Sequence, residues 1–320
     1  MKFIPATGLK NRHIQTMYAS FFRKNPQPKL THNKFTLHDG DFVDISWHHT
    51  NKRYPNTPIV ILFHGLTGSC KSHYIRGAMT SLSHAGYTSV LMHFRGCHKE
   101  INNLPRAYHS GDTEDAKAFI QSIKKEFPSA PLYAIGYSIG GNMLLKLLGE
   151  MGNTSPFKAA VSVSAPMQLD VCVNVMEKGF SRFYQKNLVK NLKQSLAIKY
   201  TKHDMQSLIN FKEEDLEGIK SFLEYDSIYT APIHGFKSAQ EYYTLCSSKQ
   251  YLKDIITPTL IIHASDDPFM NDSVLPTSNE ISSSVQLEVS RNGGHVGFIS
   301  GTVFKPVYWL EKRIVDFFRL

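Results

Sequence analysis

The sequence predicts an α/β fold with a mostly parallel central sheet and helices on both of its faces. Three observations support this. Short apolar runs of strand length alternate with longer segments of helical periodicity, as in consecutive strand–helix–strand units. The runs are continuous, as expected for parallel strands covered on both faces. Finally, the 320 residues, 42% of them hydrophobic, suffice for one large domain with a buried core.

The elements can be placed in order along the chain. The spacing of residues 9–16 indicates no catalytic or binding motif, and we interpret this segment as a polar arm packed over the domain. Residues 34–37 and 42–47 alternate apolar and polar side chains around Asp39-Gly40, which predicts a β-hairpin. The apolar runs predict strands at residues 58–63, 87–94, 131–135, 159–164, 259–264 and 285–289, and helices are expected at 72–85, 112–125, 143–148 and 304–320.

The strand at residues 58–63 ends in a loop, residues 64–69, that contains two glycines. A glycine-bearing loop at this place can supply one backbone donor of an oxyanion hole. Leu66 is the candidate for that N–H group, and a plain strand-to-helix turn is the alternative. The loop does not match the phosphate-binding pattern G-x-x-x-x-G-K-[ST], and no cofactor is expected.

His93, Cys97 and His98 lie at or just after the end of the next predicted strand. Such side chains can ligate zinc, but no second cluster of ligands completes a set of the usual spacing. No metal site is therefore expected.

A strand, a tight turn and a helix are predicted around Ser138. The segment Gly136-Tyr137-Ser138-Ile139-Gly140 matches G-x-S-x-G, a turn that holds a serine in a strained conformation with its hydroxyl above the sheet edge. The glycines are needed because backbone meets backbone where the chain reverses so sharply. Ser138 is the candidate nucleophile, and the Ile139 N–H group is the candidate second donor of the oxyanion hole.

The strand–helix alternation breaks over residues 167–251, which are helix-like and rich in aromatic and basic residues. An insertion here would lie over the carboxyl edge of the sheet, where Ser138 is expected. We therefore expect a single domain, residues 1–320, with a helical lid insertion. Its aromatic residues are interpreted as lid core more often than as substrate contacts; they include Phe180, Phe183, Tyr184, Phe211, Phe222, Tyr225, Tyr242 and Tyr243.

Two further candidates follow the last two strands of the predicted sheet. Asp267 lies just past the strand at residues 259–264, where a carboxylate can hold an imidazole by its Nδ1–H group. Asp266 is the alternative; Asp267 is preferred because it lies further past the strand and directly precedes Pro268. His295 lies on a glycine-rich loop, residues 292–297, from which it can reach the serine.

Ser138, Asp267 and His295 occur in the chain order of α/β-hydrolases, which differs from that of other serine hydrolases. In the predicted mechanism His295 removes the Ser138 proton as the hydroxyl attacks an acyl carbonyl, and Asp267 fixes the imidazole tautomer. The amides of Leu66 and Ile139 bind the oxyanion. Water then releases the acyl group.

The charge and its distribution along the sequence indicate which classes of binding partner to expect. The formal net charge is +9, but no Lys/Arg-rich block or known nucleic-acid module is present, so no nucleic-acid partner is expected. Residues 186–199 form an amphipathic basic helix, which is typical of packing on its own domain but leaves weak contact with a membrane surface open. A small-molecule or lipid ester is the expected substrate.

The cellular compartment is inferred from the cysteine spacing and from the lack of signal-peptide and membrane-spanning patterns. The cysteines are widely spaced and predict free thiols in a reducing compartment; they are Cys70, Cys97, Cys172 and Cys246. Residues 1–25 lack the apolar core of a signal peptide. No apolar run approaches the roughly 20 residues that a membrane helix needs. We therefore expect a cytoplasmic protein.

The sequence resembles the YheT-like branch of the α/β-hydrolase superfamily over nearly its whole length. The resemblance rests on residues 11–16, 64–68, 94–97, 136–142, 235–236 with 242–243, 266–269 and 293–298. It implies the α/β-hydrolase fold and hydrolysis of carboxylic esters, with some relatives acting on lipids or transferring acyl groups to alcohols. It also implies a significance for the N-terminal segment, in which Arg12 stands where the family has proline.

A serine carboxylesterase is the function predicted, acting on short- to medium-chain or lipid esters. Two alternatives remain. One is an acyltransferase that uses an alcohol in place of water on the same three residues. The other is a hydrolase-fold binding protein without turnover, although such proteins usually lose a member of the triad and this sequence keeps all three.

Overall fold

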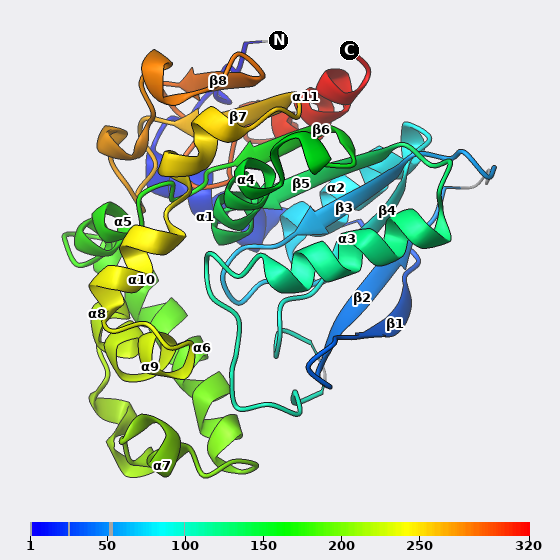
Figure 1. The fold of residues 1–320 in the computed structure, drawn as a ribbon. Helices are drawn as coiled ribbons and strands as arrows, with labels where there is room; N and C mark the ends of the chain where they lie inside the picture. The colour runs from blue at the N-terminus through cyan, green and yellow to red at the C-terminus, as the bar shows by residue number, and fades with distance from the viewer. Residues whose placement is uncertain (1, 25, 51–53, 99) are drawn as a thin grey trace.

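The computed structural model describes residues 2–24, 26–50, 54–98 and 100–320, and its main feature is an eight-stranded sheet with helices on both faces (Figure 1). The strand order is β1-β2-β4-β3-β5-β6-β7-β8. The predicted fold class is confirmed. The strands are β1 (Thr31–Thr36), β2 (Phe42–His48), β3 (Ile59–Phe63), β4 (Thr88–Met92), β5 (Leu132–Tyr137), β6 (Phe157–Val163), β7 (Thr259–Ala264) and β8 (Val285–Ser290).

The strands from β3 to β8 pair in parallel, whereas β1 and β2 form the predicted antiparallel hairpin at one edge. Successive side chains of β3 explain the continuous apolar runs. Ile61 and Phe63 belong to the core on one face, and Val60 and Leu62 to the core on the other. Because successive side chains of a strand point to opposite faces, a strand covered on both sides needs apolar residues at every position.

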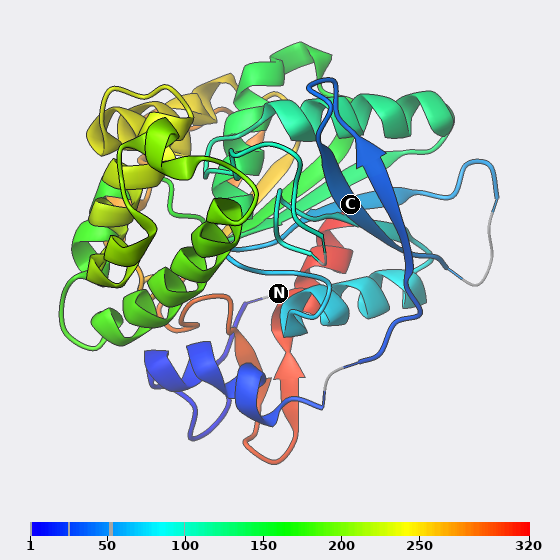
Figure 2. The ribbon, with the colours of Figure 1, turned by 90° about the horizontal axis from the view of Figure 1, so that it is seen from below.

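Helices cover both faces of the sheet. Residues of α3 (Glu114–Glu126) and α4 (Ile139–Met151) enter the core on the first face, and those of α2 (His73–His84) and α11 (Trp309–Phe318) enter the core on the second. The helix α1 (Arg12–Phe22) packs near the C-terminal part of the chain, beside the small hairpin of β9 (Ile299–Gly301) and β10 (Pro306–Tyr308) (Figure 2).

Between β6 and β7 the chain forms a group of helices, which we call the inserted helices, with a hydrophobic cluster of its own. Figure 1 shows them beyond one end of the strands. They are α5 (Leu169–Met176), α6 (Ser181–Tyr200), α7 (Met205–Ile209), α8 (Phe222–Tyr225), α9 (Ala231–Ile233) and α10 (Ala239–Cys246). Within the described part of the chain, no helix combines the length and apolar character needed to cross a bilayer.

Short helical segments of other types complete the assignment. A π-helical segment spans Asp226–Thr230, and the 3₁₀ segments are Gly152–Thr154, Glu213–Gly218, Ser248–Asp254, Asp272–Val274 and Ser278–Glu280.

The sequence-based assignment is wrong at one helix boundary and omits one helix. The last helix was expected to begin at residue 304 but begins at Trp309, because residues 299–308 form the β9–β10 hairpin, with Gly301 at a φ of 79°. The N-terminal arm contains the helix α1, which the analysis did not predict. Asn11 begins it, since its side chain accepts hydrogen bonds from the backbone N–H groups of His13 and Ile14.

A buried guanidinium connects the edge hairpin to the rest of the fold. Arg95, in the loop after β4, donates two hydrogen bonds to Asp115 of α3, at 2.6 and 2.7 Å. It also pairs with Asp41 at 3.1 Å and with Asp39 at 2.8 Å, both beside the hairpin turn. Asp41 and Arg95 are almost completely buried. The charged groups are therefore compensated by one another rather than by water.

Replacing Arg95 should test this cluster. Arg95→Met leaves the buried carboxylates of Asp41 and Asp115 without their cation, whereas Asp39 keeps Arg106 at 4.0 Å. We expect the free energy of unfolding to fall by about 3 to 5 kcal/mol. Lys34→Met is the matched control: it removes a cation from an exposed pair with Glu100, and solvent screening should leave the free energy of unfolding nearly unchanged. Urea unfolding measures both, and equal losses in the two variants would contradict a structural role for the cluster.

Candidate active site

Ser138 lies at the sharp reversal between β5 and α4. Its φ of 52° and ψ of −122° are unusual for a residue with a side chain. Two backbone hydrogen bonds hold it in place: its N–H donates to the Val163 carbonyl at 2.9 Å, and its carbonyl accepts from the Asn142 N–H at 3.0 Å. The residue is thus fixed between the neighbouring strand and the first turn of the helix.

Two of the glycines predicted at this turn are required by close backbone contact. A Cβ on Gly140 would lie 2.5 Å from the His64 carbonyl oxygen and 2.6 Å from that of Phe63. A Cβ on Gly136 would lie 2.7 Å from the Gly140 carbonyl carbon. Real Cβ atoms do not approach other atoms so closely, so the strand, the turn and the helix can meet here only without side chains.

The structure brings Ser138, His295 and Asp267 together. His295 Nε2 lies 2.9 Å from Ser138 Oγ, and His295 Nδ1 lies 2.8 Å from Asp267 Oδ2. Since a carboxylate can only accept, Nδ1 carries the ring proton and Nε2 is left to accept from the serine hydroxyl. The ring of His295 also stacks on Phe269, with centroids 3.9 Å apart. Its orientation is set by contacts at both nitrogens and on one face.

The two neighbouring aspartates have different contacts. Asp267, whose side chain is fully buried, bonds to the imidazole and accepts from the Phe269 N–H at 2.8 Å. Asp266 instead accepts from the Gly294 N–H at 2.9 Å and so holds the loop that carries His295. Burial raises the pKa of the Asp266 carboxyl. Of the two candidates, Asp267 is the one in contact with the histidine.

The helix α1 supports the His295 loop, a contact that the sequence analysis missed. The His295 N–H donates to Thr16 Oγ1 at 2.9 Å. Gln15 is fully buried; its Nε2 donates to the carbonyls of Leu9 and Ile299, and its Oε1 accepts from the Ile299 N–H at 2.7 Å. Gly294 is needed because a Cβ there would lie 2.5 Å from the Arg12 carbonyl oxygen. The one sequence signal was the resemblance over residues 11–16.

Leu66 and Ile139 border the same cavity as Ser138. Ile139 is the first residue of α4, where an N–H group has no carbonyl of its own helix to donate to. The Leu66 N–H has no hydrogen-bond acceptor among the described residues. Backbone N–H groups that lack an acceptor and border a cavity are suited to bind an oxyanion.

The loop that carries Leu66 is held by three side chains. Tyr74 Oη accepts from the Gly65 N–H at 2.9 Å, and Tyr108 Oη accepts from the Thr67 N–H at 3.0 Å. His64 accepts from the Phe94 N–H at Nε2 and donates from Nδ1 to the Gly65 carbonyl at 2.7 Å. Burial lowers the pKa of His64 to about 4, so the imidazole is neutral and keeps this tautomer at pH 7.

A cavity of about 500 Å³ lies between this edge of the sheet and the inserted helices. Ser138 and His295 border it, and so do aliphatic side chains of α5 and α6. Of the aromatic residues in the insertion, Phe222, Tyr225, Tyr242 and Tyr243 also line it, whereas Phe180 and Phe183 are exposed. The cavity is of the size that encloses a small organic ligand.

Among the described residues, His32, Cys70 and His98 form the group of side chains whose spacing suits a metal ion. Ser138, Asp267 and His295 are not members of it. His32, Cys70 and His98 therefore form a second cluster of reactive side chains, distinct from the hydrogen-bonded series at Ser138.

Comparison with known proteins identifies the family. Residues 58–302 match the family model described as the alpha/beta hydrolase fold. The chain belongs to the α/β-hydrolases. Escherichia coli (strain K12) YheT, whose esterase assignment is provisional, is 44% identical over 98% of this chain and 92% of its own. The predicted resemblance to the YheT-like branch of the α/β-hydrolases is therefore confirmed.

Two further α/β-hydrolase comparisons are informative. The medium-chain fatty acid ethyl ester synthase/esterase 2 of Saccharomyces cerevisiae is 30% identical over 91% of this chain and 67% of its own. The structure of the Pyrococcus furiosus esterase Pf2001 superposes with a TM-score of 0.57 at 18% identity, covering 92% of this chain and 98% of that one. At this identity the structural likeness supports the α/β-hydrolase fold alone.

Removing the Gln15 side chain should loosen the His295 loop of this hydrolase. Gln15→Ala leaves buried backbone groups of Leu9 and Ile299 without partners, each at a cost of about 1 to 3 kcal/mol. We expect faster hydrogen exchange in residues 9–22 and 293–301. The exposed Gln240→Ala on α10 is the matched control. Unchanged exchange in both segments would contradict the role assigned to Gln15.

Buried histidines should make the stability of this hydrolase depend on pH. Burial lowers the pKa of His64 to about 4, of His109 to about 3 and of His234 to about 2. Unfolded histidines take up protons near pH 6.5, so below that pH the unfolded chain binds more protons than the native one. The free energy of unfolding should therefore fall as the pH is lowered from about 6.5 towards 4.

Urea unfolding at a series of pH values measures this slope. His234→Asn should make the slope shallower, whereas the exposed His38→Asn should leave it unchanged. A free energy of unfolding that stays constant or rises on acidification would contradict the assignment.

Proposed function

We propose that this protein is a serine carboxylesterase in which Ser138 is the nucleophile, His295 the general base and Asp267 the residue that orients the base. The observation that carries the proposal is the continuous hydrogen-bonded series from Ser138 Oγ through His295 to Asp267, at 2.9 and 2.8 Å, beside a cavity. Such a series activates a hydroxyl that is otherwise a weak nucleophile.

Acylation follows from the positions of the hydrogen atoms. His295 Nε2 takes the Ser138 proton as Oγ forms a bond to the ester carbonyl carbon, and the carbonyl oxygen becomes an oxyanion. The N–H groups of Leu66 and Ile139 donate to that oxyanion. The carbon–oxygen bond to the alcohol then breaks, and the proton on His295 passes to the leaving alkoxide. An acyl–Ser138 ester remains.

Deacylation repeats these steps with water. His295 takes a proton from the water molecule as its oxygen attacks the acyl carbon. The bond to Ser138 Oγ then breaks, and the proton returns to the serine. Asp267 stays ionised throughout and stabilises the imidazolium that forms twice in the cycle.

We assign the inserted helices as a lid on a single-domain enzyme, with the cavity beneath them as the substrate site. Its lining is largely apolar, which suits the acyl chain of a short- to medium-chain or lipid ester. The named activity of the yeast relative, which concerns medium-chain fatty acid ethyl esters, is consistent with such a substrate.

Acyl transfer to an alcohol is the second candidate function, favoured by the synthase activity in the name of the same relative. An alcohol would replace water in the deacylation steps. Analysis of the products in the presence of ethanol separates the two reactions, because transfer yields an ethyl ester and hydrolysis yields the free acid.

Replacing the serine tests the proposal. Ser138→Ala removes the nucleophile, and kcat on p-nitrophenyl esters should fall by roughly 10⁴-fold or more. The exposed Ser283→Ala should keep wild-type turnover. A series of esters of increasing acyl length would measure the capacity of the cavity. An unchanged thermal midpoint of Ser138→Ala shows that its loss of activity is not a loss of fold; wild-type turnover in that variant would overturn the assignment.

A further inference from the structure

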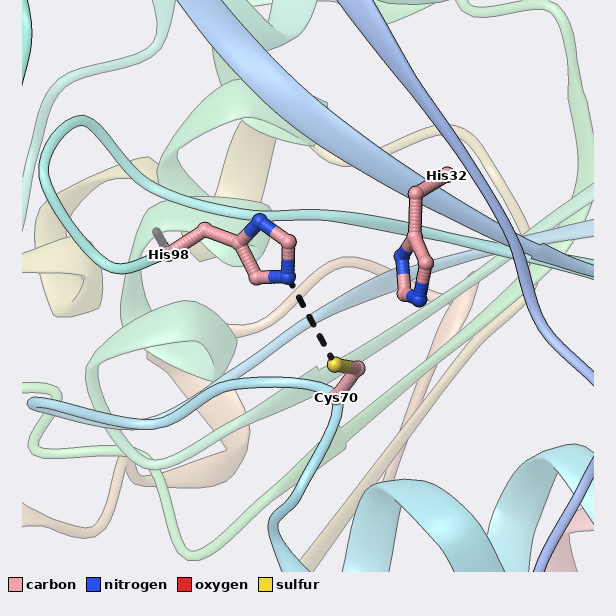
Figure 3. A group of neighbouring side chains, drawn as sticks. All are labelled: His32, Cys70 and His98. Carbon is pink, nitrogen blue, oxygen red and sulfur yellow. Dashed lines mark hydrogen bonds between the residues drawn. The ribbon is translucent and has the colours of Figure 1, made fainter. Parts of the chain in front are cut away.

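Three side chains from distant parts of the chain converge on one small space (Figure 3). His32 comes from the edge strand β1, Cys70 from the segment between β3 and α2, and His98 from the loop after β4. One ligand atom from each lies within 4.8 Å of the others, and Cys70 Sγ is 4.0 Å from His98 Nε2. The sulfur and the two imidazole rings surround this space rather than pointing away from one another.

The neighbours of the two imidazoles are those expected around metal ligands. His98 Nδ1 faces Asp44 Oδ2 at 3.6 Å, so its other nitrogen is the one directed at the cysteine sulfur. His32 Nδ1 lies 2.9 Å from Ser46 Oγ. A histidine that ligates a metal through one nitrogen ordinarily bonds through the other to a carboxylate or another polar group, which fixes the ring. Asp44 and Ser46 lie on the adjacent strand β2. Ser46 is within hydrogen-bonding distance of His32, whereas Asp44 lies close to His98 Nδ1 but makes no hydrogen bond to it.

We propose that His32, Cys70 and His98 bind a zinc ion. Zinc is commonly bound by thiolate and imidazole ligands, whereas hard cations such as calcium and magnesium prefer oxygen ligands. One thiolate and two imidazoles therefore favour zinc. A tetrahedral ion with bonds of about 2.0 to 2.3 Å requires its ligand atoms to lie about 3.3 to 3.6 Å apart. The observed separations need to shrink by an ångström or so, which small side-chain rotations provide. Water completes the fourth position.

Binding balances in charge and protons. The Cys70 thiol gives its proton to the solvent and bonds to zinc as a thiolate, while each imidazole uses the lone pair of an unprotonated nitrogen. Because zinc is divalent and only one ligand is an anion, the occupied site has a net charge of one positive. The Asp44 carboxylate, in contact with His98, compensates this charge. Cys70 is almost completely buried and His32 is exposed, so the ion can enter from the side of β1.

This site revises the expectation that no metal is bound. His93, Cys97 and His98 attracted attention because they are close in sequence, but they do not form the cluster. His93 Nε2 lies 2.9 Å from Ser46 Oγ inside the protein, and Cys97 lines the cavity beside Ser138. His98 is the member that the sequence analysis and the structure share.

The ion would join three segments of the active-site edge. It would attach the loop that carries Leu66, through Cys70, to the loop after β4 and to the edge strand β1. Bound zinc should therefore raise the thermal midpoint of the protein, because it binds the native arrangement and not the unfolded chain. This consequence does not depend on ester hydrolysis, since neither Ser138 nor His295 is a ligand.

Zinc titration of the full-length protein, freed of metal with a chelator, tests the proposal. We expect one zinc per chain by calorimetry. Cobalt in place of zinc should give the intense absorption of a thiolate–cobalt bond and the visible bands of a tetrahedral ion. Cys70→Ser should abolish the thiolate band and weaken zinc binding at least about 100-fold, and Asp44→Asn should weaken it about 10- to 100-fold.

Matched variants make the result specific. His32→Asn changes an exposed residue and should lower zinc affinity while keeping the fold, whereas the exposed His38→Asn and the neighbouring thiol variant Cys97→Ser should bind zinc as the wild type does. Three results would each overturn the proposal: no binding at one zinc per chain, a cobalt spectrum without a thiolate band, or loss of binding in Cys97→Ser with binding intact in Cys70→Ser.

Discussion

The close approach of backbone to backbone at the β5–α4 turn is the constraint on which the rest of the site depends. Gly140 lies against the carbonyl groups at the end of β3, so the first turn of α4 sits directly on the neighbouring strand. This contact places Ser138 at the carboxyl edge of the sheet and its neighbour Ile139 at the free end of a helix. It also brings the loop of Leu66 beside the serine, because that loop continues β3.

The second constraint comes from the opposite end of the sequence. His295 is not held by a strand or helix of its own; its loop is fixed by Asp266, by Thr16 and by the loop's own glycines. The amide of Gln15 completes this support through the backbone of Ile299. The geometry between Ser138 and His295 therefore depends on packing between α1 and the C-terminal part of the chain, well outside the main sheet.

Much of this arrangement can be predicted from sequence, because it follows from local rules. Continuous apolar runs identify the parallel strands, and the carboxyl ends of parallel strands meet at one edge, which is why Ser138, Asp267 and His295 could be grouped in advance. Features that depend on long-range packing could not. The role of Gln15 requires Ile299, and the cluster at Cys70 requires His32 from an antiparallel edge strand. The β9–β10 hairpin shows no strong periodicity and was missed. The α1 segment has apolar residues at helical spacing, but Ile14 and Phe21 are exposed and the polar Gln15 is the buried residue that matters, so its role could not be inferred from the pattern.

The dependence of the His295 loop on α1 has a consequence for how the protein is made. Thr16 and the His295 that it holds are separated by 279 residues. At a synthesis rate of about 5 to 20 residues per second, α1 leaves the ribosome roughly 15 to 55 s before its partner exists. During that interval its apolar face, including Tyr18 and Ala19, has nothing of the C-terminal part to pack on. The contact between α1 and the His295 loop can therefore form only after residue 295 has been synthesised, so this part of the site is completed late in folding.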